Sequence, residues 1–249
     1  MASADTAPTG APGAIDPSQA GSLDEPQVRA MFDRIAGLYD RMNSVMTAGL
    51  HHEWRRRAAD LAELSPGDRA LDVGTGTGDL ALELAARVAP GGEVVGIDFA
   101  ERMLELARAK AVEANVRFET GNALALAFPD DAFDAATVGF GARNFSDLER
   151  GLAEMARVVR PGGRVVVLEI TTPRRPPLST FFELWFDHAI PALGRVVDSQ
   201  AYSYLPLSVR RFPGPDELAA IMWRCGLRQI RYVLTAGGII ALHVGMVST

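Results

Sequence analysis

The sequence predicts an α/β fold built on a doubly wound, mostly parallel sheet, and three observations support this prediction. Short apolar runs alternate with segments of helical periodicity between residues 69 and 170, the order typical of parallel sheets with helices on both faces. The first apolar run ends in a turn with a glycine at every second position, Gly74-Thr75-Gly76-Thr77-Gly78. About 20 residues later an acid, Asp98, ends the second run, as in the nucleoside-binding fingerprint of a βαβ unit.

The chain before the first strand divides into a tail and a helical segment. Residues 1–25 are rich in Ala, Pro, Gly, Ser and Asp without periodicity, which predicts a disordered tail. From Pro26 onwards apolar residues recur at helical spacing, and a second helix is expected at residues 51–63. We expect residues 26–64 to form a helical lid on a single domain that spans residues 26–249.

The elements of the domain follow in a regular order. Strands are expected at residues 69–73, 93–98, 116–120, 133–138 and 163–170, and helices at residues 79–88, 101–114 and 146–158. Residues 160–163, Arg-Pro-Gly-Gly, predict a turn that ends the last of these helices. Two apolar runs, 228–234 and 239–247, flank Ala236-Gly237-Gly238 and predict a β-hairpin. Segment 171–215 is too long for a plain connection, so we expect a helical cap over the site.

Composition and charge narrow the class of protein. The net charge of −6 gives no support to a nucleic-acid partner, although residues 170–249 hold eight arginines and five acids and lean towards an anionic surface. The single cysteine, Cys225, excludes an intrachain disulfide and a cysteine-built metal site. No apolar run is long enough to span a membrane and no secretory signal is visible, so a cytoplasmic location is expected.

The spacing of the glycines in this turn restricts the chemical class of ligand that it can bind. A dinucleotide fingerprint is G-x-G-x-x-G and places a pyrophosphate at a helix N-terminus. Here the spacing is G-x-G-x-G, and Asp79 stands where the third glycine of that fingerprint would be. A carboxylate at the start of a helix repels a phosphate but does not repel a cation. The turn favours a positively charged nucleoside without phosphates, of which S-adenosylmethionine (SAM) is the common example, and it disfavours a dehydrogenase.

Side chains around this turn supply candidate cofactor contacts. Asp98 is expected to accept hydrogen bonds from both ribose hydroxyls, and Asp72 to receive the ammonium of the methionine moiety. Asn122, after the third strand, is placed to contact the adenine edge. The alternatives are that Asp98 caps the next helix and that Asn122 is a turn residue. The main chain that a ligand approaches is expected at Gly74, Gly76 and Gly78.

A second candidate group follows the fourth strand, in the stretch Gly139-Phe140-Gly141-Ala142-Arg143-Asn144-Phe145. Ligands of such sheets bind outside the carboxyl ends of the strands, so Arg143 and Asn144 are expected to face the crevice. The alternative is that Arg143 pairs with a surface acid and that Asn144, or Ser146, caps the helix at residues 146–158.

Several motifs resemble those of the UbiE/COQ5 family of quinone-biosynthesis C-methyltransferases. Residues 39–43, Tyr-Asp-Arg-Met-Asn, followed by Thr47, Gly49, His51 and Trp54, are similar to the first family signature, and residues 157–163 are similar to the second. Three further stretches add to the resemblance: Phe140-Gly141-x-Arg143-Asn144, Tyr202-x-Tyr204-Leu205-Pro206-x-Ser208 and Leu234-Thr235-Ala236-Gly237-Gly238. The resemblance covers residues 28–247.

The resemblance implies a class I SAM-dependent methyltransferase fold, with sheet order 3-2-1-4-5-7-6 and an antiparallel last strand. It also implies cofactor contacts at Thr77, Asp98, Asn122 and Ala123. The chain departs from the family pattern in three relevant positions: Gly139 where serine is usual, His52 where arginine is usual and Asn122 where aspartate is usual. The cofactor contact that this serine makes in the family is then lost, or is replaced by a contact of the Gly139 backbone.

The implied reaction is methylation of a ring carbon of a prenylated quinol. Such a carbon gains electron density when a ring hydroxyl loses its proton, and an ordinary phenol has a pKa of about 10. Arg143 stays charged, so it is expected to stabilise the phenolate while Asn144 donates a hydrogen bond. The candidate bases are His51, Asp40 or a water held by them, and Tyr39 is expected to stack on the ring or orient that water. The alternatives are that His51 caps a helix and that Tyr39 only packs on the lid.

The prenyl tail of such a substrate needs apolar surroundings. Residues 178–186 are apolar enough to line a channel for the tail or to lie at a bilayer surface, and Arg174 and Arg175 suit anionic headgroups. The alternatives for this stretch are a homodimer interface and a plain core helix.

Three hypotheses of function remain at this stage. The first is SAM-dependent C-methylation of demethylmenaquinol, with the ubiquinone-pathway 2-polyprenyl-6-methoxy-1,4-benzoquinol as a second substrate. The others are methylation of another small molecule and a SAM-binding module without catalysis. No cluster of His, Asp and Cys has the sequence spacing of metal ligands, so no metal is expected.

Overall fold

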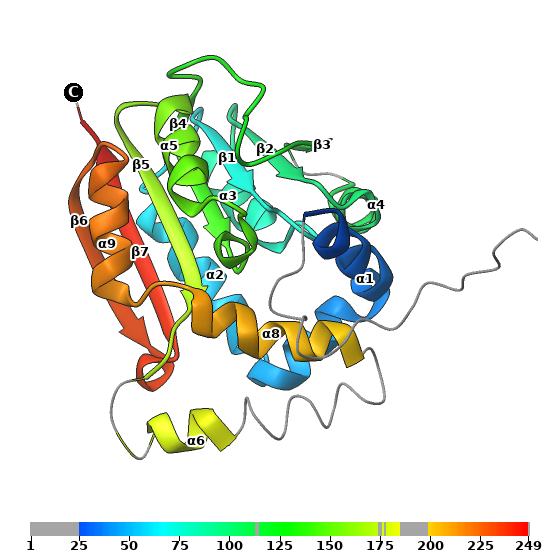
Figure 1. The fold of residues 1–249 in the computed structure, drawn as a ribbon. Coiled ribbons are helices and arrows are strands. Elements are labelled where there is room, and N and C mark those ends of the chain that lie inside the picture. The colour runs from blue at the N-terminus through cyan, green and yellow to red at the C-terminus, as the bar shows by residue number, and fades with distance from the viewer. Residues whose placement is uncertain (1–24, 113–114, 174–175, 177, 185–198, 249) are drawn as a thin grey trace, which may run out of the picture.

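The described residues of the computed structural model form one seven-stranded sheet with helices on both faces (Figure 1). These residues are 25–112, 115–173, 176, 178–184 and 199–248. The strand order is β3-β2-β1-β4-β5-β7-β6, as the family resemblance implied, and β7 runs antiparallel to both of its neighbours. Three sequence predictions fall outside the described residues: the tail up to residue 24, the Arg174-Arg175 pair, and residues 185–186 of the apolar stretch.

The strands lie close to their predicted positions. They are β1 (Arg69–Val73), β2 (Glu93–Asp98), β3 (Val116–Thr120), β4 (Phe133–Gly139), β5 (Val159–Ile170), β6 (Leu227–Thr235) and β7 (Ile240–Val247). β1 pairs in parallel with β2 and β4, β2 pairs in parallel with β3, and β4 with β5. The carboxyl ends of β1 to β4 consequently lie at one edge of the sheet, which is where ligands of such sheets bind.

The predicted turn at residues 160–163 is wrong. β5 already begins at Val159, which pairs with Phe133, and the next pairing joins Arg164 to Ala135. Residues 160–163 are a bulge within the strand, and Gly162 supplies the positive φ of 81° in it. The predicted hairpin is confirmed, because β6 and β7 pair antiparallel across the short helix η4 (Ala236–Gly238).

Alternate residues of each strand pack against helices on opposite faces of the sheet. Ala70 and Val94 pack on the face covered by α2 (Leu50–Leu61), α3 (Asp79–Val88) and α4 (Glu101–Lys110). Their neighbours Leu71 and Val95 pack on the other face, under α5 (Leu148–Val158) and α9 (Pro215–Arg224). This follows from the period of two along a strand, since successive side chains point to opposite faces.

A third apolar cluster joins the two segments predicted as lid and cap. Val28 and Met31 of α1 (Glu25–Thr47) pack with Phe182 of α6 (Leu178–Leu184) and with Tyr204 and Val209 of α8 (Ser199–Arg211). Figure 1 shows α1 and α8 beyond the edge of the sheet where β1 and β2 end. None of the described helices combines the length and the apolar character needed to cross a bilayer.

We expect Leu84→Ala to lower the free energy of unfolding by about 2–5 kcal/mol, because Leu84 is fully buried between α3 and the sheet. Chemical denaturation followed by circular dichroism measures this change. Val112→Ala is the control, because Val112 is 82% exposed, and its effect should stay within about 0.5 kcal/mol. Equal effects of the two substitutions would contradict this description of the core.

Candidate active site

The glycine-rich turn connects β1 to α3 and adopts a backbone that its glycines permit. Gly74, Gly76 and Gly78 have φ angles of 64°, 55° and 83°. At Gly78 a Cβ would lie 2.9 Å from the ring of Phe118, so contact as well as conformation excludes a side chain there. The amide of Gly76 donates to Oδ2 of Asp98 over 2.8 Å, which joins the turn to the end of β2.

Asp72 and Asp98 are buried carboxyl groups on neighbouring strands. Asp72 accepts hydrogen bonds from the hydroxyls of Thr75 and Thr137 over 2.6 and 2.7 Å, and burial raises the pKa of Asp72 to about 6. Oδ1 of Asp98 accepts from the amide of Ala100 over 2.9 Å, and burial also raises the pKa of Asp98. Asp98 thus holds the turn before α4, but the N-cap of that helix is Ala100 and no side chain caps it, so the alternative that Asp98 caps the helix is wrong. Its contact with a ribose stays a prediction.

These residues line a cavity at the carboxyl edge of the sheet, which α1 borders with Glu25, Val28, Phe32 and Tyr39. Gly139 also lines it, at the end of β4, where a Cβ would lie 3.0 Å from Leu80. Among the charged residues of this lining that the structure describes, Arg55 alone is basic; the acids are Glu25, Asp72, Asp79 and Asp98. Such a charge balance fits a cationic nucleoside such as SAM and disfavours one that carries phosphates.

The predicted adenine contacts lie in the same cavity. Asn122 and Ala123 follow β3 and line it. Oδ1 of Asn122 accepts from the amide of Leu124 over 2.8 Å, and its Nδ2 lies 3.4 Å from a carboxylate oxygen of Glu25. The alternative that Asn122 is a turn residue is thus confirmed, and its contact with adenine stays a prediction.

Arg143 lies in the short helix η2 (Ala142–Asn144) after β4, and its side chain is buried against a buried acid. Its Nη1 donates to Oε1 of Glu169 and to the carbonyl of Phe140, each over 2.6 Å. Burial disfavours the guanidinium charge, but Glu169 outweighs burial and raises the pKa of Arg143. The alternative that Arg143 pairs with a surface acid is wrong, because Glu169 is only 1% exposed. Nε of Arg143 is buried and has no hydrogen-bond partner among the described residues.

Asn144 is held beside Arg143 by α8. The hydroxyl of Tyr204 donates to Oδ1 of Asn144 over 3.0 Å, which leaves the amide Nδ2 as the group that Asn144 can offer to a ligand. The helix cap that was assigned to Asn144 or Ser146 is wrong, because Asp147 caps α5 by accepting from the amide of Arg150.

A larger, mainly apolar cavity of about 410 Å³ adjoins the first one. Side chains of α1, α2, α8 and η4 line it, and the polar groups in its wall include His51, Arg143 and Tyr204. Phe32, Tyr39, Arg55 and Phe140 line both cavities. The two cavities therefore meet at Tyr39 and Phe140, and the contact of Tyr39 with a substrate ring stays a prediction.

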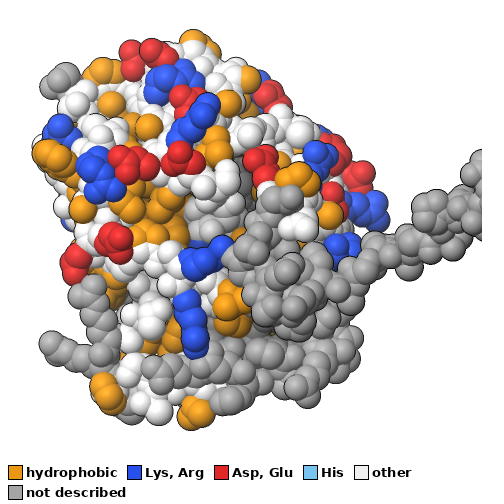
Figure 2. All heavy atoms as spheres, in the orientation of Figure 1, with side chains coloured by type: hydrophobic (Ala, Val, Ile, Leu, Met, Phe, Trp, Pro, Cys, Tyr) orange, Lys and Arg blue, Asp and Glu red, His pale blue; other side chains and the backbone are white. Residues whose placement is uncertain are grey.

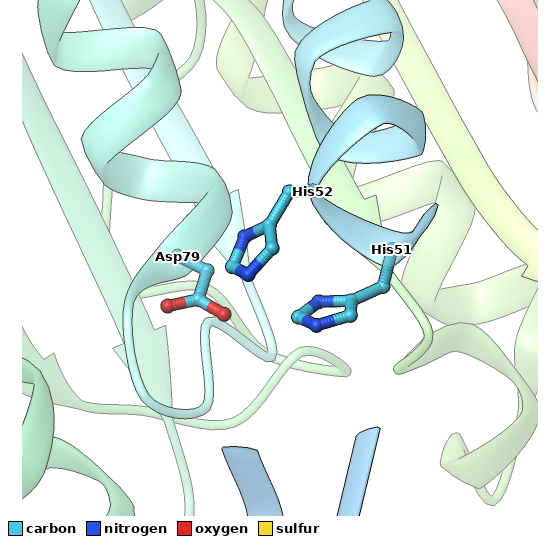
Figure 3. Close-up of side chains that lie close together, drawn as sticks. All are labelled: His51, His52 and Asp79. Atoms are coloured by element: carbon cyan, nitrogen blue, oxygen red, sulfur yellow. The ribbon is translucent and has the colours of Figure 1, made fainter. Parts of the chain in front are cut away.

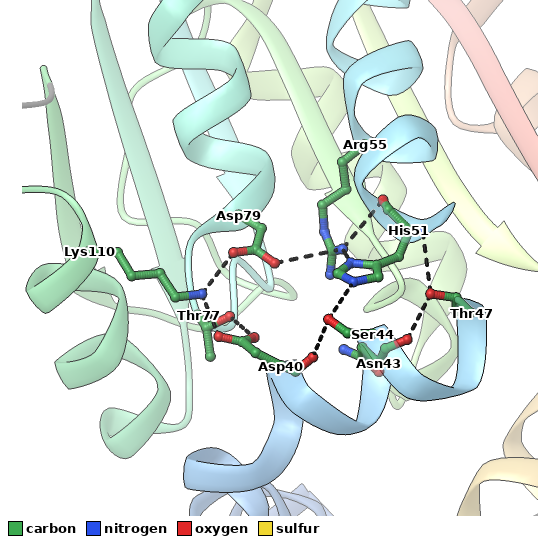
Figure 4. Close-up of polar contacts among 9 residues, drawn as sticks. All are labelled: Asp40, Asn43, Ser44, Thr47, His51, Arg55, Thr77, Asp79 and Lys110. Atoms are coloured by element: carbon green, nitrogen blue, oxygen red, sulfur yellow. Dashed lines mark hydrogen bonds and ion pairs between the residues drawn. The ribbon is translucent and has the colours of Figure 1, made fainter. Parts of the chain in front are cut away.

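His51 is buried and both nitrogens of its ring are engaged (Figure 4). Nη1 of Arg55 donates to Nδ1, so the neutral ring carries its proton on Nε2, which lies 3.1 Å from Oγ of Ser44. Burial and the charge of Arg55 lower the pKa of His51 to about 4. His51 is neutral near pH 7 and is a weak proton acceptor. The N-cap of α2 is Gly49 and no side chain caps this helix, so the alternative that His51 caps a helix is wrong. The backbone amide of His51 donates to Oγ1 of Thr47 over 3.4 Å.

Asp40 ties α1 to the glycine-rich turn and to α4 (Figure 4). Its Oδ1 accepts from the hydroxyl of Thr77 over 2.6 Å, and its Oδ2 lies 2.5 Å from Nζ of Lys110. Lys110 also donates to Asp79 over 2.7 Å, and Asp79 lies 3.7 Å from Arg55. These contacts give Asp40 a structural role, and none of them supports the prediction that it is a base.

One cluster of potential metal ligands occurs among the described residues, and the sequence spacing did not reveal it (Figure 3). His51, His52 and Asp79 have ligand atoms within 4.8 Å of one another. Arg55 donates to His51 and pairs with Asp79, so a divalent cation here would meet a guanidinium. The geometry favours a polar network at this place, and the absence of a metal stays a prediction.

Sequence reasoning missed Glu169 and gave no role to Arg55, Lys110 or Tyr204. Glu169 has a signal in the sequence, since it is an acid inside the apolar strand 165–170 and a buried acid needs a charged or hydrogen-bonding partner. Lys110 has no such signal, because its partners Asp40 and Asp79 come from other elements.

Relatives of known function share most of the chain. Demethylmenaquinone methyltransferase of Thermus thermophilus is 48% identical over 219 residues, which are 86% of this chain and 99% of that protein. Demethylmenaquinone methyltransferase of Deinococcus radiodurans is 47% identical over 222 residues, 88% of this chain and 91% of that protein.

A comparison with solved structures and a match to a family model agree with the names of these relatives. A SAM-dependent methyltransferase of Thermotoga maritima, described as a possible histamine N-methyltransferase, has a TM-score of 0.62 at 20% identity, covering 87% of this chain and 98% of that one. This likeness concerns the fold alone, which is the class I methyltransferase fold. The model of the ubiE/COQ5 methyltransferase family matches residues 20–247. The chain belongs to the ubiE/COQ5 methyltransferase family.

Proposed function

We propose that this protein is a SAM-dependent C-methyltransferase that converts demethylmenaquinol to menaquinol. The observation that carries this proposal is the meeting of an acid-lined nucleoside cavity with a large apolar cavity that has Arg143 in its wall. Relatives named demethylmenaquinone methyltransferase, at 47–48% identity over nearly their whole length, support the choice of substrate. The ubiquinone-pathway benzoquinol is the alternative ring, and another small molecule or a SAM-binding module without catalysis is the alternative function.

The acid-lined cavity is the proposed SAM site. When bound, SAM supplies a methyl group on a positively charged sulfur. Asp98 holds the ribose, Asp72 attracts the ammonium, and Asn122 with Ala123 lies at the adenine end. Thr77 and the backbone of Gly74, Gly76, Gly78 and Gly139 allow close approach of the ligand.

Arg143 and Asn144 act on the ring hydroxyl of the quinol. The guanidinium of Arg143, in the wall of the apolar cavity, is the positive charge available to a phenolate, and Nδ2 of Asn144 is the available hydrogen-bond donor. A fixed positive charge lowers the pKa of the hydroxyl from its ordinary value of about 10, and each unit corresponds to about 1.4 kcal/mol. Glu169 holds the guanidinium in place, and Tyr204 holds the amide. Tyr39 stacks on the ring at the junction of the two cavities.

The proton of the hydroxyl leaves through water. His51, with a pKa of about 4, is too weak a base to take it in one step, and Asp40 is occupied by Thr77 and Lys110. We assign to His51, in the wall of the apolar cavity, the positioning of that water, which would replace Ser44 as the partner of Nε2.

A prenylated quinol resides in lipid, so the enzyme works as a peripheral protein at the cytoplasmic surface of the membrane. The apolar cavity holds the first part of the prenyl tail, and Phe182 of the predicted stretch 178–186 does line it. Residues 26–64 act as the lid and residues 171–215 as the cap of this single domain. A homodimer is a further prediction that no described contact tests.

Methyl-labelled SAM and reduced demethylmenaquinol, given to the purified chain, should yield menaquinol labelled on a ring carbon. Mass spectrometry of the product locates the label. The parallel reaction with the benzoquinol decides between the two rings. Absence of transfer to either quinol, with SAM binding intact, would refute the proposed substrate class.

Arg143→Ala should lower kcat by about 10²–10³-fold and leave the Kd of SAM nearly unchanged, because the guanidinium acts on the phenolate. Intact SAM binding by calorimetry shows that the variant is folded. Arg160→Ala, at an exposed arginine paired with Asp134, is the control and should retain full activity. Equal losses in turnover and in SAM affinity would contradict the role of Arg143.

The affinity for SAM should fall as the pH drops below about 6. Burial raises the pKa of Asp72 to about 6, so the carboxyl becomes neutral below that pH and no longer attracts the ammonium. Calorimetry across this range should show a Kd that rises by up to about tenfold per pH unit. Asp72→Asn should bind more weakly and should lose this dependence. An unchanged pH dependence in Asp72→Asn would contradict the assignment.

A further inference from the structure

The outer face of α1 carries a row of exposed arginine and aliphatic side chains, which we call the α1 stripe: Arg34, Leu38, Arg41 and Val45. These residues are three or four positions apart, so they lie on one side of the helix. Leu38 is 44% exposed and Val45 is 71% exposed. Large aliphatic side chains that remain exposed in a row between arginines are typical of helices that lie in a membrane interface.

The acidic residues of α1 are engaged away from the stripe. Asp33 accepts from the backbone amide of Arg102 on α4, and Asp40 binds Thr77 and Lys110. Glu25 lies at the start of the helix, beside Asn122. The positive charge that the stripe offers is that of Arg41, which is exposed and has no ion-pair partner among the described residues, although the chain as a whole carries a net charge of −6.

The α1 stripe is continuous with the rim of the apolar cavity. Leu38 lines that cavity and is also exposed. Leu50, at the start of α2, lines the cavity too and is 52% exposed. Phe182 of α6 lines the same cavity, and Leu184 of that helix is 56% exposed. In Figure 2 the acidic side chains gather on the upper part of the molecule, whereas the coloured side chains at the lower end, around α6, are hydrophobic or basic.

We propose that the α1 stripe docks on an anionic lipid bilayer, with the rim of the apolar cavity against the acyl region. The proposal rests on the proposed function, because a prenylated quinol reaches the cavity from within the bilayer. Arg41 lies among the headgroups, while Leu38 and Val45 enter the interface. A second copy of the chain is a poorer occupant, since a two-fold contact would set the arginines of one stripe against those of the other.

Co-sedimentation with vesicles of phosphatidylcholine and phosphatidylglycerol tests this surface without requiring activity. The full chain should bind these vesicles and should bind phosphatidylcholine alone much more weakly. Val45→Asp and Arg41→Glu should each lower the partition coefficient by about tenfold or more. Val233→Asp, at a residue of β6 that is 52% exposed, is the matched control and should bind as the wild type does.

Two further measurements distinguish the docking proposal from the proposed function and from a dimer interface at the same place. With a short-chain, water-soluble quinol and no vesicles, Val45→Asp should turn over like the wild type, whereas it should be slower on a long-chain quinol in vesicles. If no quinol is methylated but vesicle binding follows the pattern above, the docking surface stands and the proposed function fails. Equal vesicle binding by Val45→Asp and Val233→Asp would overturn the proposal that the α1 stripe is the docking surface. Dissociation of a dimer by Val45→Asp, with vesicle binding unchanged, would overturn it as well.

Discussion

The common direction of β1, β2, β3 and β4 is the constraint on which the site depends. Because these strands are parallel and adjacent, the glycine-rich turn, Asp98, Asn122 and Gly139 all emerge at the same edge of the sheet. The hydrogen bond from the amide of Gly76 to Asp98 then fixes the turn against the neighbouring strand. Residues separated by as many as 65 positions in the chain form one cavity wall without any loop having to reach across the fold.

Helix α1 bounds both cavities, and a chain of polar contacts fastens it to the sheet domain. Asp40 binds Thr77 of the turn and Lys110 of α4, and the contacts continue through Asp79 and Arg55 to His51. The apolar cluster of α1 with α6 and α8 fastens its other side. One helix therefore borders both the acid-lined cavity and the apolar cavity, so that in the proposed function the positions of the methyl donor and of its acceptor would depend on the same element.

The buried pair of Arg143 and Glu169 lies where the proposed function places the ring hydroxyl. Removing Arg143 and Glu169 from water is costly, and their mutual attraction with the added backbone hydrogen bonds offsets that cost. The pair leaves Nε of Arg143 buried, with no hydrogen-bond partner in the part of the chain that the structure describes. A charge in an apolar wall is poorly screened, so in the proposed function it would act on a phenolate more strongly than an exposed arginine would.

The sequence by itself determined the strands, the ligand-binding turn and the acids that follow it. Their signals are local: the glycines of the turn where φ is positive, an apolar run for each buried strand, and an acid at a strand end. Only the tertiary structure decided which partner each charge takes. Asp40, one of the candidate bases, binds Thr77, His51 is held by Arg55, and Glu169 pairs with Arg143. Such pairs join elements that are distant in the chain, and burial, which sets the pKa of His51 and Asp72, exists only once the elements have packed together.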